Sequence, residues 1–416
     1  MKIPQPAYAP SRRAFLATLP IVGLAGTRLI AAATPRPFRI DIPQSTINRI
    51  VRRVKDARWP DRIEGTTDWR YGVNWDYMKA LADYWTTRYD WRTAEARLNR
   101  YPQFMAQVGG YDVHFYHVRG KGPRPLPLIL THGWPGSVME FQEAIGPLTD
   151  PSSVGGSAED AFDVVVPSIP GFGFSSKPKV PIGPQTVARL WHELMTSVLG
   201  YSRFGAQGGD WGSSITTELA RSFPDSMLGI HLNAAGGGVS AADPSDEERS
   251  WQRASAAFRT AEMDYFNEQQ HKPETVGFAL YDNPLGAAAW ITEKFRGWTD
   301  AGTALDPALS KDQILTNIMI YLVTDTMATA VWFYRGSLDD VSSSGRGSRS
   351  GRITVPTGFA SFPAEMLALN PPRSVLERGF NLVHYSKAAR GGHFACFEQP
   401  QLFVEDVRAF FRRVRG

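Results

Sequence analysis

Apolar residues between positions 38 and about 107 recur three and four residues apart, which is the spacing of amphipathic helices. The stretches "INRIVRRVKDARW" and "YMKALADYWTTRYDW" show this spacing most plainly, and the whole region is dense in tryptophan. The pattern predicts that residues 34–110 form a helical segment in front of the rest of the protein.

The hydrophobic period changes at Tyr111, from that of helices to that of strands. Here "YDVHFYHV" alternates like a strand, and continuous apolar runs follow, as in the buried strands of a parallel sheet. These runs are "PLILTHGWPG", "FDVVVPSIPGFGFS", "RFGAQGG" and "GIHLNAA". Helices are expected between them, over residues 187–199 and 211–222. Strands that alternate with helices predict a doubly wound, mostly parallel α/β sheet, whose first part spans residues 111–235.

This alternation stops at residues 236–240, "GGGVS", and helical text follows from about 244 to 335. The Ser/Gly/Arg-rich stretch "DDVSSSGRGSRSGR" then predicts a mobile loop. We therefore expect an inserted helical cap with its loop over residues 236–352. Strands return with "RITVPTGF" and "NLVHYSK", and an amphipathic helix, "PQLFVEDVRAFFRRVRG", completes a second core part over residues 353–416.

The first residues resemble an export signal. Arg12 and Arg13 precede an apolar run, and "AAA" at 31–33 offers a cleavage site, as in bacterial twin-arginine signals. The run is too short to span a bilayer comfortably. We expect residues 1–33 to be removed, a mature chain that starts near Thr34, and a periplasmic or secreted protein. The alternative is a flexible basic N-terminus that stays attached.

Composition excludes several classes of protein. Hydrophobic residues make up 43% and charged residues 21%, and the net charge is +4, without the basic stripe of a nucleic-acid binder. The one cysteine, Cys396, allows neither an internal disulfide nor a cysteine zinc site, and the eight histidines are dispersed. We expect no metal, no cofactor, no nucleic acid and no later membrane span.

"RFGAQGGDWGSS" has the order strand, tight turn, helix. Gly208 and Gly212 flank Asp210 two residues away on either side, which is the pattern of a nucleophile elbow. Such an elbow projects Asp210 beyond the carboxyl ends of the strands, where open α/β sheets bind their ligands. The alternative is that Asp210 only caps the following helix, because Asp is a good N-cap residue.

Two backbone N–H groups are candidates for an oxyanion hole. Trp211 follows Asp210 at the start of a helix, and Trp134 lies in "THGWPG", a turn directly after a buried strand. Pro135 would fix that turn, through a cis bond as one possibility. His132 fits a structural hydrogen-bonding role better than a catalytic one.

His393, in "RGGHFACFEQP", is the histidine best placed to serve as a base, because the order in α/β-hydrolases is nucleophile, acid, histidine. The acid should follow a late strand. Asn233, after "GIHLNAA", carries no charge, whereas Glu365 follows "RITVPTGFASFPAE" and can orient His393. Asp339 and Asp340 are weaker candidates in the expected loop.

A carboxylate nucleophile suits a saturated electrophilic carbon, because displacement there gives an ester that a histidine-activated water can hydrolyse. Epoxides and alkyl halides both fit. An epoxide leaves as a basic alkoxide and needs an acid donor, for which tyrosines are suited, whereas a halide leaves unassisted. The elbow itself fits both substrates, since Trp211 could serve a halide.

Several long motifs resemble one family. They are "HGWPGS", "PSIPGFGFSSKP", "GGDWGS", "KPETVGFALYDNPLGAAAWITEKF", "ILTNIMIYLVTDTMATAVWFY", "VPTGFASFPAE" and "RGGHFACFEQP". From about Phe38 to the end the chain is similar to the α/β-hydrolase-fold epoxide hydrolases of the microsomal and juvenile-hormone type, including their N-terminal segment. The membrane anchor of the mammalian members is replaced by the apparent export signal.

The resemblance implies a residue set. It points to Asp210 as nucleophile, Glu365 and His393 as the water-activating pair, and Trp134 and Trp211 in the oxyanion hole. It adds two acid-donating tyrosines, Tyr265, eight residues before Pro273, and Tyr334, at the end of "WFY". "NEQQHKP" is more polar than is usual beside the first tyrosine. Tyr281 and Tyr321 are interpreted as packing aromatics.

These features predict an epoxide hydrolase that forms a vicinal diol through an ester on Asp210, in detoxification or in the catabolism of aromatic hydrocarbons. Cap aromatics such as Trp290, Trp298 and Trp332 suggest an apolar or aryl epoxide, although they could simply pack the cap. A haloalkane dehalogenase and an exported binding protein without turnover stay open as alternatives, and so does a homodimer.

Overall fold

The computed structural model describes residues 34–235, 241–302, 304–306, 308–343, 351–366 and 369–415. Three predictions fall outside these residues. They are the export signal over 1–33, the end of the strand–helix alternation at 236–240, and the Ser/Gly/Arg-rich loop at 344–350.

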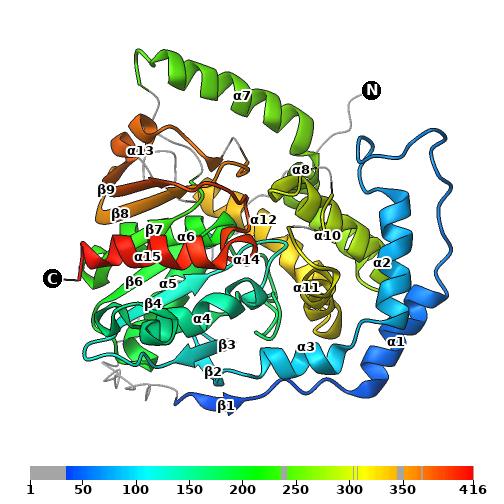
Figure 1. Cartoon of the computed structure of the whole chain (residues 1–416), viewed down its shortest axis with the longest axis horizontal. Coiled ribbons are helices and arrows are strands. Elements are labelled where there is room, and N and C mark those ends of the chain that lie inside the picture. Colours follow the sequence, from blue (N-terminus) through cyan, green and yellow to red (C-terminus); the bar gives the residue numbers. More distant parts are fainter. Residues whose placement is uncertain are drawn as a thin grey trace, which may run out of the picture. The chain divides into compact units, whose positions relative to one another are not determined.

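The described residues contain a nine-stranded sheet in the order β1-β2-β3-β5-β4-β6-β7-β8-β9 (Figure 1). From β5 to β9 all neighbouring strands are parallel, and β1, β2 and β3 extend the sheet by antiparallel pairing. The strands are β1 (Arg36–Phe38), β2 (Gln103–Val108), β3 (Tyr111–Val118), β4 (Leu126–Thr131), β5 (Phe162–Pro167), β6 (Phe204–Gly208), β7 (Met227–Leu232), β8 (Ile353–Ser361) and β9 (Phe380–Lys387). The predicted mostly parallel sheet is confirmed.

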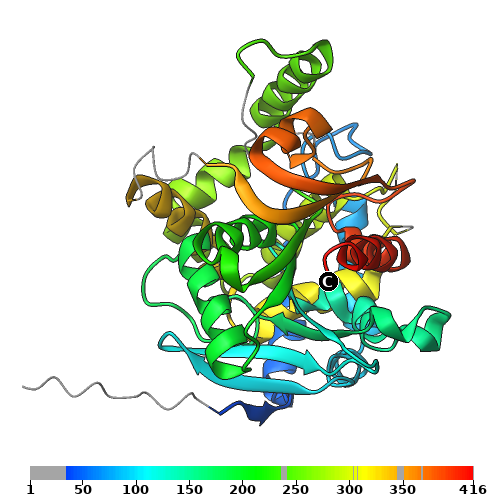
Figure 2. The ribbon, with the colours of Figure 1, turned by 90° about the vertical axis from the view of Figure 1, so that its left-hand side faces the viewer.

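Helices cover both faces of this sheet, because its central strands are apolar on both sides. Every residue of β5 and β6 is buried. Figure 2 shows the last helix, in red, on one side and green helices on the other. The core helices are α4 (Gln142–Thr149), α5 (Pro184–Glu193, continued by a π-helical turn over Leu194–Val198), α6 (Asp210–Ser222), α13 (Arg373–Gly379), α14 (Ala395–Glu398) and α15 (Pro400–Arg412). The doubly wound arrangement follows.

The N-terminal segment is helical only in part. It contains α1 (Gln44–Lys55), α2 (Trp75–Thr87) and α3 (Trp91–Leu98), as predicted, but the helical prediction up to residue 107 is wrong at β2. Gly109 and Gly110 both have positive φ, 54° and 87°, and they join β2 to β3 as a two-residue hairpin. The stretch "QFMAQV" has helical spacing, but its pairing with β3, the strand that follows the glycine turn, makes it a strand.

The inserted cap is helical, as predicted. It consists of α7 (Asp246–Glu262), α8 (Asp264–His271), α9 (Pro273–Leu280), α10 (Pro284–Trp298), α11 (Lys311–Val323) and α12 (Met327–Ser343). The prediction that Asp339 and Asp340 lie in a loop is wrong, because α12 continues through both. Asp340 Oδ2 accepts a hydrogen bond from Gln185 N, 2.9 Å away, at the start of α5.

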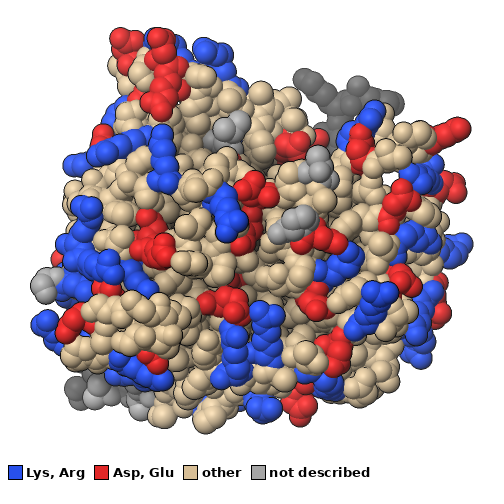
Figure 3. Space-filling model, in the orientation of Figure 1, with Lys and Arg blue, Asp and Glu red and all other residues tan. Residues whose placement is uncertain are grey.

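Within the described ranges, no single helix is long and apolar enough to cross a membrane. Only α11 and α12 taken together reach that length and composition, and they are bent by 88° relative to each other. On the face shown in Figure 3, acidic and basic side chains are interspersed over the surface.

Asp406 ties the final helix to the sheet. Its Oδ2 accepts a hydrogen bond from Nε2 of His231 in β7 at 2.8 Å, and its Oδ1 accepts one from Nε2 of His384 in β9 at 2.9 Å. Burial acts to raise the pKa of Asp406, but the two histidine hydrogen bonds outweigh it and hold this pKa well below its ordinary value. The stabilisation is therefore complete above the pKa of an unfolded aspartate, about 3.9, and is lost as the pH falls below it.

We expect Asp406→Asn to lower the free energy of unfolding at pH 7 by about 2 kcal/mol, because a charge-assisted acceptor shared by two histidines is lost. The difference from the parent protein should shrink at pH 3. Urea unfolding at both pH values measures it, with Glu405→Gln, on the exposed side of the same helix, as the control. An equal loss at both pH values would contradict the assignment to the Asp406 charge.

Candidate active site

Asp210 lies on a sharp turn between β6 and α6, and its φ of 47° is in the left-handed region. The turn requires small neighbours. A Cβ on Gly208 would lie 2.1 Å from the Gly212 carbonyl oxygen, and one on Gly212 would lie 2.0 Å from the Thr131 carbonyl oxygen. Gly209, not Asp210, occupies the N-cap position of α6. The alternative that Asp210 only caps the helix is therefore wrong.

The Asp210 carboxylate has a different partner on each oxygen. Oδ1 accepts the backbone N–H of Trp134 at 2.8 Å, and Oδ2 lies 3.1 Å from Nε2 of His393. Gly133 makes the first contact possible, because a Cβ there would lie 2.0 Å from Asp210 Oδ1. The Trp134–Pro135 peptide bond is cis. One of the two N–H groups expected to form an oxyanion hole thus already binds the carboxylate.

Trp211, the source of the other expected N–H, is the second residue of α6. The first N–H groups of a helix have no acceptor within the helix, so this group is available to an oxygen above the turn. Trp211 also lines the cavity described below.

His393 connects Asp210 to Glu365. It lies in the loop between β9 and α14, and its Nδ1 donates to Glu365 Oε1 at 2.8 Å. Burial acts to lower the pKa of His393, but the charges of Glu365 and Asp210 outweigh it and raise this pKa well above its ordinary value. Glu365 follows β8 and is held in turn by the Met366 N–H, at 2.7 Å from Oε1. The structure brings together the three residues predicted to act in series.

Asn233 follows β7, the strand next to β8, but does not take the place of the acid. Its Oδ1 accepts a hydrogen bond from Gln207 at 2.8 Å, and it packs against Gly209 of the elbow. His132 has the structural role predicted for it. Its Nδ1 donates to the Gly133 carbonyl at 3.0 Å, and its Nε2 accepts the Ile169 N–H at 3.3 Å.

The two predicted tyrosines meet across the site from the cap. Tyr265 lies on α8 and Tyr334 on α12, with ring centroids 6.1 Å apart, and the Trp134 ring lies 5.6 Å from the first and 5.8 Å from the second. Both are buried. Burial, together with the nearby Asp210 charge, raises the pKa of Tyr265 and of Tyr334 well above the ordinary value. Both phenols therefore keep their protons at neutral pH.

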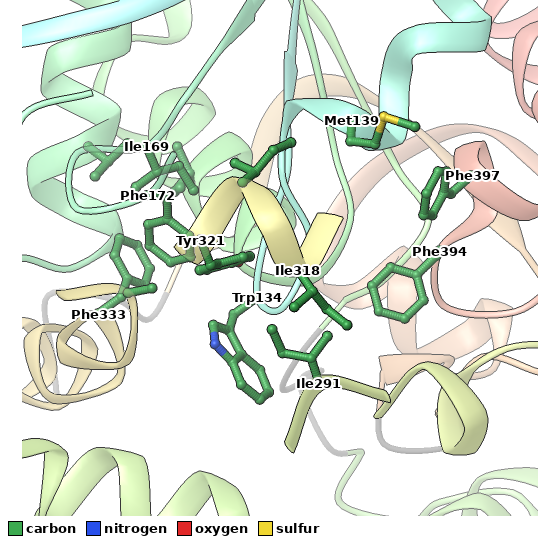
Figure 4. Close-up of a cluster of buried hydrophobic side chains, with 14 of the residues drawn as sticks. Trp134, Met139, Ile169, Phe172, Ile291, Ile318, Tyr321, Phe333, Phe394 and Phe397 are labelled. Carbon is green, nitrogen blue, oxygen red and sulfur yellow. The ribbon is translucent and has the colours of Figure 1, made fainter. Parts of the chain in front are cut away.

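The other two tyrosines considered have different surroundings. Tyr321 is a buried packing residue, as predicted, in the cluster around Trp134 in Figure 4. Its hydroxyl donates to the Gly136 carbonyl at 2.5 Å. Tyr281 is 46% exposed, so the prediction that it packs inside is wrong. It follows the last residue of α9, where its side chain meets solvent.

A cavity of about 320 Å³ opens above Asp210 between the core and the cap. That volume suits one small molecule. Its lining is largely apolar and contains Asp210, Trp211, Ser213, Ser214, Phe258, Arg259, Met263, Tyr265, Phe266, Tyr334, Ser337, Met366 and Leu369. Trp290, Trp298 and Trp332 do not line it. Trp298 belongs to the hydrophobic core, Trp290 and Trp332 pack against that core, and Trp332 also lines a separate surface cavity. Phe258, Met263 and Phe266 supply the apolar surface expected of those tryptophans.

Two half-buried carboxylates near His393 are not predicted from the sequence. Glu398 accepts N–H groups of Gly392 and Phe394 on either side of the histidine, at 3.2 and 3.1 Å. Glu140 lies on the turn after Pro135, close to Asp210 and His393. Neither belongs to a recognisable spacing pattern. Among the residues that the structure describes, no group of three or more His, Cys, Asp or Glu is arranged to hold a metal ion.

The chain matches two family models, one described as epoxide hydrolase N terminus over residues 35–141 and one as alpha/beta hydrolase fold over residues 127–281. It is 44% identical over 384 residues to a Stigmatella aurantiaca (strain DW4/3-1) protein provisionally named an epoxide hydrolase, covering 91% of this chain and 85% of that protein. It is 37% identical over 405 residues to epoxide hydrolase 1 of Sus scrofa, covering 90% and 88%. The crystal structure of juvenile hormone epoxide hydrolase from Bombyx mori superposes with a TM-score of 0.82 at 31% identity, covering 92% and 95%.

Proposed function

Because the chain belongs to the epoxide hydrolases of the α/β-hydrolase fold, we propose that it opens its epoxide through a covalent ester on Asp210. The observation that carries this proposal is the position of the Asp210 carboxylate. It lies on a strained elbow between two buried tyrosines and a buried histidine that is bound to Glu365.

In the first step, an Asp210 oxygen attacks a carbon of the epoxide ring. The carbon–oxygen bond of the ring breaks, and a new bond joins that carbon to Asp210. Tyr265 and Tyr334 donate hydrogen bonds to the leaving oxygen, which takes a proton from one of them and becomes a hydroxyl. The proton that His393 releases when Asp210 loses its charge restores that phenol through solvent. Oδ1 stays on the Trp134 N–H, so Oδ2 is the attacking atom.

In the second step, His393 changes its role. The Asp210 charge helps to keep His393 protonated, and that charge disappears when Asp210 becomes an ester. His393 can then take a proton from a water molecule that attacks the ester carbonyl, while Glu365 stabilises the imidazolium. The N–H groups of Trp134 and Trp211 bind the oxyanion. The proton on His393 passes to the departing oxygen and the diol leaves. The new Asp210 carboxylic acid then gives its proton to His393, so that Asp210 regains a carboxylate.

The apolar lining of the 320 Å³ cavity supports an apolar or aryl epoxide as the substrate class. Diol formation from styrene oxide by the purified protein tests the activity. Tight binding of styrene oxide without any diol would instead support the non-catalytic binding protein.

The acid pair separates epoxide opening from dehalogenation. We expect Tyr265→Phe and Tyr334→Phe each to slow ester formation from styrene oxide about tenfold, and the double variant to slow it by about 10²–10⁴, because general-acid assistance is lost. Rapid-quench mass spectrometry measures the ester, and Tyr281→Phe, at an exposed site, is the control. Bromide release from a bromoalkane that is fast and unaffected by these variants would favour the haloalkane dehalogenase.

A further inference from the structure

A second, much smaller cavity lies on the other side of the Asp210 carboxylate. Its volume is about 10 Å³, which is close to the minimum of about 10–15 Å³ that one water molecule needs. His393 and Glu140 line this small cavity but not the large one, whereas Tyr265 and Tyr334 line only the large one. Asp210 therefore separates a space for substrate from a space for a single water.

Glu140 supplies the carboxylate of the small cavity. It belongs to the 3₁₀ turn Val138–Phe141, and its side chain folds back over Gly136, where a Cβ would lie only 1.5 Å from Glu140 Oε1. A glycine at position 136 thus leaves room for this carboxylate beside the site. Burial raises the pKa of Glu140 to about 8. Whether protonated or ionised, the group keeps an oxygen that can accept a hydrogen bond.

We propose that Glu140 positions the water that hydrolyses the Asp210 ester. This inference rests on the proposed covalent mechanism. The water lies in the small cavity, gives one proton to Nε2 of His393, and donates its other O–H to a Glu140 oxygen. Its oxygen bonds to Cγ of Asp210, the bond from that carbon to the alkyl oxygen breaks, and the proton on His393 passes to the departing alkoxide.

In this geometry the two steps of the reaction take place on opposite sides of the Asp210 carboxylate. The substrate reaches Asp210 from the tyrosine side, and the water waits on the histidine side, where Phe141, Asn233 and Phe394 close the space. A carboxylate oxygen of Glu140 in so small a space limits the orientations that the water can take. Glu140 is therefore a positioning residue, and its loss should affect only the second step.

Glu140 also has a structural role, which the experiment must separate from its role in positioning the water. The backbone N–H of Ser137 donates a hydrogen bond to the Glu140 carboxylate. The Ser137 hydroxyl in turn accepts the Met139 N–H at 3.2 Å. Glu140 and Ser137 together cap the 3₁₀ turn. Ser137→Ala weakens the same cap, also removes the hydrogen bond that the Ser137 hydroxyl donates to Asn317 at 2.7 Å, and leaves the Glu140 oxygens in place, so it is the control for the structural role.

The test measures both steps in single turnovers with styrene oxide. Stopped-flow tryptophan fluorescence follows them, and acid-quenched intact mass counts the ester. We expect Glu140→Leu to form the ester at the parent rate and to hydrolyse it at least about tenfold more slowly, so that ester accumulates. Glu140→Gln, which keeps an acceptor oxygen, should restore most of the hydrolysis rate.

Three results would overturn the proposal. They are hydrolysis at the parent rate in Glu140→Leu, equal slowing of both steps in that variant, and equal slowing of hydrolysis in Ser137→Ala. If the parent protein forms no ester at all, the covalent mechanism fails first, and that outcome is distinguishable because it needs no variant.

Discussion

Asp210→Ala is expected to reduce diol formation from styrene oxide by at least about 10³-fold, because the variant lacks the atom that attacks the ring. The remaining residues cannot replace it. His393 and Glu365 activate water for an ester that no longer forms, and the tyrosines only assist the leaving oxygen. Steady-state diol production, measured by chromatography, gives the effect.

The backbone at position 210 complicates this variant, since alanine at a φ of 47° costs about 1–2 kcal/mol. Asp210→Asn is therefore the companion variant, because asparagine tolerates the left-handed region and can still accept the Trp134 N–H. Both should be folded and inactive, and Asp225→Asn, at an exposed site, should be fully active. Diol formation at the parent rate by either folded variant would place the nucleophile elsewhere.

His393→Gln is expected to stop the reaction halfway. Ring opening needs Asp210 and the tyrosines, so the ester should still form, whereas its hydrolysis should fall by at least about 10³-fold without the base. The protein should then gain the mass of one styrene oxide per chain and keep it. Intact mass spectrometry after mixing measures the adduct, and peptide mapping assigns it to Asp210.

The control for that variant is His271→Gln, which changes an exposed histidine of the cap. It should turn over normally and hold no adduct at the end of the reaction. If His393→Gln hydrolyses its ester as fast as the parent protein, another group activates the water. If it forms no ester, His393 is needed for the first step, and the assigned order of roles is wrong.

The sheet could be predicted because most of its strands are recognisable from their own short stretches of sequence. The buried parallel strands β4 and β5 are short apolar runs bounded by turns, and such runs are typical of buried strands. β2 was missed because its identity depends on a partner. "QFMAQV" fits a helix by its own spacing, and only the hairpin at Gly109 and Gly110 aligns it with β3.

Those residues of the candidate site that lie in sequence motifs could be predicted. Asp210 and His393 each lie in a glycine-rich motif whose backbone demands are visible in the sequence. Glu140 and Glu398 are single glutamates on short helical turns, and they matter only because the fold places them, half-buried, beside His393. Tyr281 shows that a motif can also mislead, because this aromatic residue lies within a family motif and yet faces solvent.

The transfer of an oxygen atom from Asp210 to the product is the decisive test of the covalent mechanism. In ¹⁸O-labelled water, with protein in excess over styrene oxide, we expect diol from the first turnover to contain unlabelled oxygen and Asp210 to become labelled. Later turnovers should yield labelled diol. Full label in the diol of the first turnover would contradict the covalent mechanism, because water itself would then have opened the ring.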